Sequence, residues 1–350
     1  MVRLSSRRRR LVFAALLGLS TAVLVLARQG EIPEKKWATI QEGGLVTAVA
    51  IDPLTPTRVY AASARALFAS DDAGVTWTPL PHGPAHHAVT ALAIEPGPPS
   101  ILYVGTNGGG LLRGHAGNSK FARVGEGLEP DFVSAIAFDP SSRGRVYVGT
   151  NQGVFRSDDG GAHWQERNSG LINVHVTCVV VDPGNPKILY AGTNAGGVFR
   201  SADGAASWTP SNSGLTSTIV WSLAFVAGPT PALYAATYDG LFRSSPAGSA
   251  WTPLSRGMRS TFVLSFASDP DAATLYAGTA ADLYRSHDGG ATWESASRGL
   301  TNSFVSALAL HPKDPKILYA GTNSGVFKTI DGGRHWAAVR LIPEDGRAAQ

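Results

Sequence analysis

Cysteine is nearly absent from this 350-residue sequence, and the single one, Cys178, has no partner for a disulfide within the chain. Histidine and cysteine also never occur at the spacing of metal ligands, because the adjacent pair His86 and His87 has no further ligand nearby. The sequence therefore predicts no metal site and no other cofactor.

Charged residues are scarce at 16% of the chain, and acidic ones are missing from its N-terminal segment. Five arginines and no Asp or Glu precede residue 28, so residues 28–350 hold 25 basic against 26 acidic side chains. The formal net charge of +4 therefore reflects the first 27 residues. The near-neutral remainder gives no indication of nucleic-acid binding.

The first 27 residues have the pattern of a targeting segment. Four consecutive arginines, Arg7–Arg10, precede the uncharged apolar run Leu11–Ala27. This run is long for a signal-peptide core and short for a membrane helix, so a cleaved signal peptide and a retained anchor helix are both open. In either case the positive-inside rule predicts that the rest of the chain is extracytoplasmic. We expect a linker at residues 28–36 and a tail at 341–350.

What the sequence has in abundance is glycine, proline and a repeat of about 43 residues; the 40 glycines and 22 prolines indicate many turns. Seven aromatic residues mark one repeated position, at spacings of 44, 43, 44, 43, 42 and 43: Trp77, Phe121, Trp164, Trp208, Trp251, Trp293 and Trp336. Seven apolar segments each begin with a valine: Val46, Val89, Val133, Val176, Val220, Val263 and Val305. Each of the first six aromatic markers lies 12 residues before the next of these valines. Such a period is typical of a repeat architecture.

One repeat contains four short strand patterns. From Val305 the segment VSALALHP alternates and ends at a proline, KILYAGT is rich in residues that favour strands, GVFKT is a third strand, and HWAAVRL follows a DGG turn. Four short antiparallel strands in 40–45 residues form one propeller blade, which buries its faces only against neighbouring blades. The sequence therefore predicts an all-β fold, a seven-bladed β-propeller over residues 37–340.

The turn before each marker has its own signature, Ser/Thr-x-Asp-x-Gly-x-x-Trp. The carboxylate and the hydroxyl can accept hydrogen bonds from turn N–H groups, glycine supplies a positive φ, and tryptophan packs between blades. The turn aspartates, which we interpret as structural, are Asp72, Asp159, Asp203, Asp288 and Asp331. Repeat four has Ala205 in the glycine position, and repeats two and five have lost the signature.

At these residues the sequence resembles the Asp-box (BNR-repeat) propellers, over about residues 37–340. That family includes sialidases, two-propeller xyloglucanases, sortilin-type receptors and photosystem II assembly factors. The assembly factor, a single propeller behind an N-terminal export segment, is similar in size and layout. This resemblance implies a protein client at the membrane, with a cell-envelope glycan as the alternative ligand. The motif specifies the fold far more than the function.

Closure of the ring is left open by the sequence. Trp37 resembles a further outer-strand marker, but it lies 9 residues before Val46 instead of 12. Residues 36–42 can supply a strand to the last blade, where they compete with the strand after Trp336.

Residues that recur at one blade position are expected to serve the blade. Cys178 stands where other repeats have an alanine, so we interpret it as a small strand residue and not as a catalytic thiol. Cations recur just before the Asp-box: Arg113, Arg156, Arg200, Arg243, Arg285 and Lys328. They either form a basic ring for an anionic ligand or are individually paired or solvated, and we favour the second interpretation.

Candidate binding residues break the repeat pattern on loops that a propeller places on one face. Trp221, for example, stands where five other blades have Thr or Ser. The candidates that can build an aromatic, cationic and acidic binding surface are Asp131, Trp221, Tyr238, Asp239, Arg256, Arg259 and Asp282. Arg65, His86, His87 and Glu129 also break the pattern.

Two functions follow from this face. The first is a non-catalytic scaffold that binds a protein client at the membrane. The second is glycoside hydrolysis or glycan binding, and hydrolysis needs two carboxylates, or a tyrosine nucleophile with an acid. The loops are short and nearly equal, the single propeller lacks the second propeller of a xyloglucanase, and only Arg65, Arg256 and Arg259 resemble a sialidase arginine cluster. We therefore expect no catalytic residues.

Overall fold

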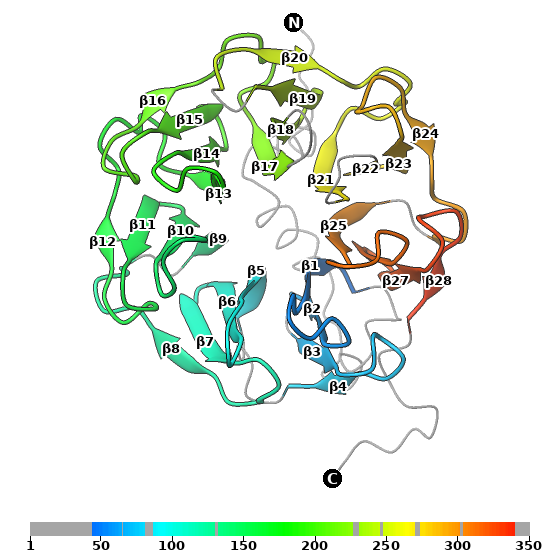
Figure 1. Cartoon of the computed structure of the whole chain (residues 1–350), viewed down its shortest axis with the longest axis horizontal. Helices are drawn as coiled ribbons and strands as arrows, with labels where there is room; N and C mark the ends of the chain where they lie inside the picture. Colours follow the sequence, from blue (N-terminus) through cyan, green and yellow to red (C-terminus); the bar gives the residue numbers. More distant parts are fainter. Residues whose placement is uncertain are drawn as a thin grey trace, which may run out of the picture.

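The fold is built of strands and turns. The computed structural model describes residues 44–64, 66–80, 87–129, 132–226, 231–245, 248–269, 274–301 and 304–339. They form seven four-stranded antiparallel sheets, arranged as blades around a central axis (Figure 1). The prediction of a seven-bladed propeller is confirmed.

Each blade contributes one strand to each of four concentric positions. The inner strands are β1 (Val46–Ile51), β5 (Ala88–Glu95), β9 (Val133–Phe138), β13 (Val176–Val181), β17 (Val220–Val226), β21 (Val263–Ser268) and β25 (Val305–Leu310). The second strands are β2 (Val59–Ser63), β6 (Ile101–Asn107), β10 (Val146–Thr150), β14 (Leu189–Thr193), β18 (Ala232–Thr237), β22 (Leu275–Thr279) and β26 (Leu318–Thr322). The third strands are β3 (Leu67–Ser70), β7 (Leu111–His115), β11 (Gly153–Ser157), β15 (Val198–Ser201), β19 (Gly240–Ser244), β23 (Leu283–Ser286) and β27 (Gly325–Thr329). The outer strands are β4 (Thr78–Pro79), β8 (Ala122–Val124), β12 (Gln165–Glu166), β16 (Thr209–Pro210), β20 (Trp251–Pro253), β24 (Glu294–Ser295) and β28 (Ala337–Ala338).

The core lies between adjacent blades, because each sheet has two apolar faces that only its neighbours can cover. Tyr147 of blade three, for example, packs with Val176 and Trp208 of blade four in one buried cluster. The indole Nε1 of Trp208 donates to the Arg167 carbonyl of blade three at 2.8 Å. The repeated tryptophan therefore anchors an outer strand to the preceding blade, as its recurrence predicts.

The Asp-box turns are internally satisfied. In blade four the Ser207 hydroxyl and N–H donate to Asp203 at 2.6 and 2.9 Å, and Ser201 donates to the same carboxylate at 2.8 Å. Hydrogen bonds from Ser207 and Ser201 lower the pKa of Asp203 to about 2. Ala205 adopts φ +68°, so the turn keeps its left-handed residue without glycine. The structural interpretation of these aspartates agrees with this geometry.

The ring closes through contacts between its first and last blades. Every described sheet consists of four strands consecutive in sequence, so no described blade combines strands from both ends. The Ser306 hydroxyl of blade seven donates to the Val46 carbonyl of blade one at 2.5 Å, and the Tyr319 hydroxyl donates to the Ala73 carbonyl at 2.6 Å. The strand considered at residues 36–42 lies outside the described residues.

The predicted targeting segment at 1–27, the linker at 28–36 and the tail at 341–350 also lie outside the described residues. The anchor helix expected in the first of these segments is therefore not part of the described fold. Within the described ranges, no helix has the length and apolar character needed to cross a membrane.

Candidate functional site

One face of the propeller carries two kinds of loop, namely the connections between blades and the turns between second and third strands. Backbone hydrogen bonds join them: Tyr238 N–H donates to the Ile219 carbonyl at 3.2 Å, and Ala280 N–H donates to the Phe262 carbonyl at 3.1 Å. We call this side the connection face. The Asp-box turns lie at the opposite ends of the third strands, on what we call the Asp-box face. The loops that carry the candidate residues thus share one face, as expected.

Every inner strand has a β-bulge directly after its opening valine. The bulge residues are Thr47, Thr90, Ser134, Thr177, Trp221, Leu264 and Ser306. In four blades the bulge hydroxyl donates to the carbonyl of the next blade's opening valine, namely from Thr90, Ser134, Thr177 and Ser306. The bulge thus joins neighbouring inner strands, because it turns one side chain away from the ladder toward the next blade.

Blade five replaces this hydroxyl with an indole. Trp221 is only 8% exposed, and its Nε1 has no hydrogen-bond partner among the described residues. Its ring lies 5.6 Å from that of Phe262, and Phe262 lies 5.1 Å from Tyr238, which is 46% exposed. These three residues form the aromatic cluster, which crosses from blade five to blade six. The sequence predicted that Trp221 and Tyr238 share a face, and Phe262 is the residue that joins them.

Three charged candidates lie on the loops that carry this cluster. Asp239 and Tyr238 are exposed neighbours in the turn between β18 and β19. Arg256 and Arg259 are exposed on the connection that leads to Phe262, and the Arg259 N–H donates to the buried Tyr284 hydroxyl at 2.9 Å. That bond fixes the backbone of the connection beside the aromatic cluster and leaves the guanidinium of Arg259 at the surface.

Two further candidates do not add to this cluster. The carboxylate of Asp282 accepts hydrogen bonds from Ser295 at 3.1 Å and from Ser297, so it holds the turn of its own blade. Asp131 lies outside the described residues, as do Arg65 and His86. Glu129 is exposed on another connection, and His87 lies against the Gly108–Gly110 turn.

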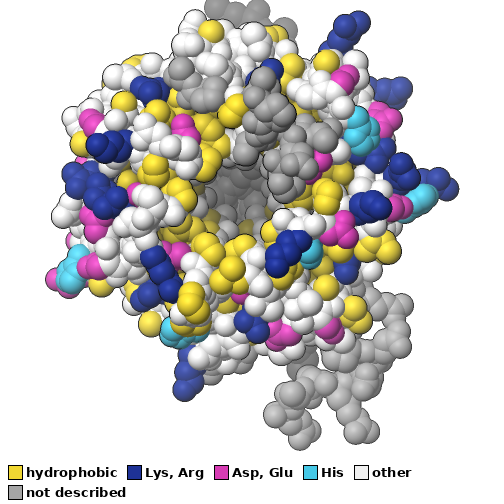
Figure 2. Space-filling model, viewed as in Figure 1, with side chains coloured by type: hydrophobic (Ala, Val, Ile, Leu, Met, Phe, Trp, Pro, Cys, Tyr) yellow, Lys and Arg dark blue, Asp and Glu magenta, His cyan; other side chains and the backbone are white. Residues whose placement is uncertain are grey.

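Sequence reasoning missed further residues on the connection face, mostly apolar, that lie around the ring. A partly buried residue precedes each opening valine: Leu45, Ala88, Phe132, His175, Ile219, Phe262 and Phe304. On the connection into blade four, Ile172 is 82% exposed and Val174 is 42% exposed. A recurring apolar position indicates core packing, so the sequence alone does not reveal that the residues before the valines are only partly buried. Figure 2 shows hydrophobic side chains gathered around the central opening on the face in view.

Three of the recurring cations on the third strands are paired with groups of the protein itself. Arg156 donates to both oxygens of Asp158 at 2.7 and 2.8 Å, and Arg285 donates to Glu294 at 2.6 Å. Lys328 donates to the Ala73 carbonyl at 2.6 Å. This geometry favours individually paired cations over a basic ring that binds an anion.

Cys178 has the environment of a structural residue. The residue is partly exposed as a whole, but its thiol is enclosed, and burial raises its pKa to about 12. Within the described ranges, no three His, Cys, Asp or Glu side chains are grouped to hold a metal ion.

The comparisons with known proteins agree with the repeat. The BNR/Asp-box repeat family matches residues 284–295. The "Probable oligoxyloglucan-reducing end-specific xyloglucanase" of Neosartorya fischeri is 30% identical over 140 aligned residues, covering 34% of this chain and 17% of the relative. The chain therefore spans about a sixth of that relative's length.

Solved structures share the fold at low identity. A GH74 xyloglucanase from Xanthomonas campestris superposes with a TM-score of 0.71 at 20% identity, over 87% of this chain and 55% of that protein. YCF48, solved bound to a D1 peptide, superposes with a TM-score of 0.64 at 17% identity, over 82% of this chain and 93% of YCF48. This chain thus spans little more than half of the first protein, whereas it spans nearly all of the second.

Proposed function

The chain is a seven-bladed propeller of Asp-box repeats, and we propose that it is a non-catalytic, extracytoplasmic scaffold that binds a peptide segment of a protein client. The connection face is the binding surface. The observation that carries this proposal is the aromatic cluster of Trp221, Phe262 and Tyr238, in which Trp221 stands where five other blades have Thr or Ser.

The cluster has the composition of a protein-binding hot spot. Tyr238 offers an exposed ring, Phe262 and Trp221 support it from below, and Arg259 places a cation on the same connection. The Trp221 indole N–H is a buried donor without a partner in the described structure. An unsatisfied buried donor is costly, so a peptide carbonyl that reaches it contributes both affinity and orientation.

The location follows from a different part of the chain. Arginines before an apolar run support export, so the propeller is placed outside the cytoplasm. YCF48, whose propeller fold this chain shares, was solved with a bound D1 peptide, which supports a peptide ligand.

A glycan ligand is the second candidate function, because the segment similar to a xyloglucanase is 30% identical over 140 residues. Hydrolysis needs a second free carboxylate opposite the first. Among the described candidates, Asp282 is already bonded to two serines, whereas Asp239 is exposed next to Tyr238 of the aromatic cluster. This arrangement supports binding more than hydrolysis.

A phage-displayed library of random peptides, selected on the full chain, tests the proposal. Peptides enriched on the wild type should bind a Tyr238→Ala/Arg259→Ala variant at least about ten-fold more weakly, a loss of roughly 1.4 kcal/mol. Trp221→Phe, which keeps the ring but removes the indole donor, should also weaken binding. The matched control is Ile330→Ala, since Ile330 is 69% exposed on the Asp-box face.

Equal losses in the control and the connection-face variants would contradict the proposed site. Hydrolysis of xyloglucan oligosaccharides by the wild type, abolished by Asp239→Asn, would replace the scaffold with an enzyme.

A further inference from the structure

The Asp-box face contains a spacer that repeats between blades. In blades three, six and seven the cation on the third strand pairs with the second-strand tyrosine of its own blade and reaches the Asp-box turn of the next blade. Arg285 donates to the Gly332 carbonyl at 2.8 Å, and Lys328 lies 5.5 Å from the Tyr319 ring while it donates to the Ala73 carbonyl. A cation therefore fills the space between neighbouring blades on this face.

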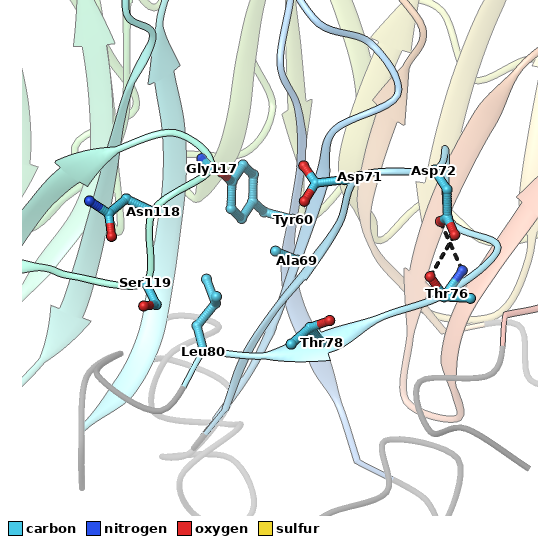
Figure 3. A pocket seen from close by; sticks show the side chains of 10 residues that line it. All are labelled: Tyr60, Ala69, Asp71, Asp72, Thr76, Thr78, Leu80, Gly117, Asn118 and Ser119. Carbon is cyan, nitrogen blue, oxygen red and sulfur yellow. Dashed lines mark hydrogen bonds between the residues drawn. The ribbon is translucent and has the colours of Figure 1, made fainter. Parts of the chain in front are cut away.

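Blade one lacks this cation. Ala69 stands on β3 where the other six blades have Arg or Lys, and it pairs with Thr78 of β4 as Arg156 pairs with Gln165 in blade three. The alanine leaves a pocket of about 390 Å³ between blades one and two. Its walls are Tyr60, Ala69, Asp71, Asp72, Thr76, Thr78, Leu80, Gly117, Asn118 and Ser119 (Figure 3).

Blade three shows which group the pocket is missing. There Asp158 binds two arginines, namely Arg145 through Nε at 2.7 Å and Arg156 through its guanidinium at 2.7 and 2.8 Å. In blade one the corresponding carboxylate, Asp71, binds the counterpart of Arg145 alone, because Arg58 donates to its Oδ1 at 2.6 Å.

The second oxygen of Asp71 accepts no hydrogen bond from the described residues, and the side chain is 70% exposed. Half of a two-arginine site is thus present. The carboxylate that would hold the second guanidinium is open toward the pocket, and Figure 3 shows it beside the Tyr60 ring and above Ala69.

The wall of the pocket opposite Ala69, which belongs to blade two, also differs from the corresponding turn in the other blades. Blade two has lost its Asp-box, and Gly117 stands where blade four has Gly204, whose carbonyl faces Arg156 at 3.4 Å. The Gly117 N–H donates to the Tyr60 hydroxyl at 2.8 Å, which holds this turn against blade one without a cation between them. The Arg58 guanidinium also lies against Gly117, but Arg58 is not among the residues that line the pocket.

We propose that this pocket binds the guanidinium group of an arginine side chain from a partner. Asp71 accepts the two parallel N–H bonds that Arg156 makes to Asp158 in blade three, and the Tyr60 ring lies beside the bound group as Tyr147 does there. A guanidinium suits this site better than an ammonium because its planar fork matches a carboxylate. The site lies on the Asp-box face, so it is independent of the function proposed for the connection face.

The probes are the peptides Ac-Gly-Arg-Gly-NH2 and Ac-Gly-Lys-Gly-NH2, titrated into the full chain and followed by NMR shifts of the Gly117, Asn118 and Ser119 amides. The arginine peptide should shift these amides saturably, and the lysine peptide should bind at least about five-fold more weakly. Ala69→Arg supplies the recurring cation from within the chain, so it should abolish the response without lowering the melting temperature. Asp71→Asn should weaken binding about five-fold or more.

The matched control is Asp158→Asn, because the equivalent space in blade three is already filled by Arg156. This variant should bind the arginine peptide like the wild type. Absence of saturable shifts in the wild type, unchanged binding by folded Ala69→Arg, or equal binding of the lysine peptide would each overturn the assignment.

Discussion

Replacement of Gly170 by alanine tests how the blades are held together. Gly170 lies on the connection from β12 to β13 at φ +86°, and a Cβ there would lie 2.1 Å from the Trp208 carbonyl oxygen. The Trp208 N–H also donates to the Ser169 carbonyl at 2.8 Å. A side chain at position 170 must therefore push apart the backbones of blades three and four at the tryptophan anchor.

Gly289→Ala is the matched control, because it separates the cost of a left-handed alanine from the cost of the clash with blade four. Gly289 has a similar φ of +70°, but a Cβ at this position would meet nothing within 4 Å. Gly289→Ala should cost about 1–2 kcal/mol, the penalty of a left-handed alanine. Gly170→Ala adds the clash, about 1–3 kcal/mol, and a weakened buried hydrogen bond of about 1 kcal/mol, so its total is about 3–6 kcal/mol.

Urea unfolding of the full chain, followed by tryptophan fluorescence, measures both variants. The unfolding midpoint of Gly170→Ala should fall well below that of Gly289→Ala, with similar m-values. Equal midpoints would mean that the contact between the connection and the next tryptophan does not hold the blades together.

Two further predictions concern titratable groups. Because the folded pKa of Asp203, about 2, lies below the unfolded value, its stabilisation is complete above about pH 4 and is lost as the pH falls toward 2. Because the carboxylate is exposed, it contributes less than about 1 kcal/mol to the free energy of unfolding. The Asp203→Asn variant should therefore lose less stability than the wild type between pH 4 and pH 2. Thermal melts at each pH will measure this difference. A steeper loss in the variant would contradict this sign. The Cys178 thiol, whose pKa is about 12, should resist iodoacetamide at pH 8 in the folded chain and react once the chain is unfolded in urea, with mass spectrometry as the readout. Rapid alkylation of the native protein would show that the thiol is not enclosed.

The repeat and its turn chemistry could be predicted from the sequence because both are local. The spacing of Trp164 and Trp208 gave the blade period, and the Ser-x-Asp pattern gave the turn even at Ala205, which adopts the left-handed backbone without glycine. A blade of this length cannot bury its faces alone, so the period also determined the propeller.

The candidate site was only partly predictable, because exposure depends on the neighbouring blade. Trp221 broke the repeat pattern and so drew attention, but the sequence could not show that Phe262 covers it and leaves Tyr238 as the exposed ring. Asp282 broke the pattern equally well, yet its carboxylate is bonded within its own blade. Departure from the repeat identifies a position that differs, but it does not distinguish a surface group from an internal one.

What the sequence by itself determined is the number of blades, the order of their strands and the placement of loops on two faces, since these follow from periodicity and turn residues within about 43 positions. What only the tertiary structure decided is how segments from different blades meet. The pocket opened by Ala69 depends on Gly117 in the next blade, 48 positions away. Such contacts form only when the ring closes and the sheets pack face to face, so their chemistry is a property of the assembled propeller and not of any single repeat.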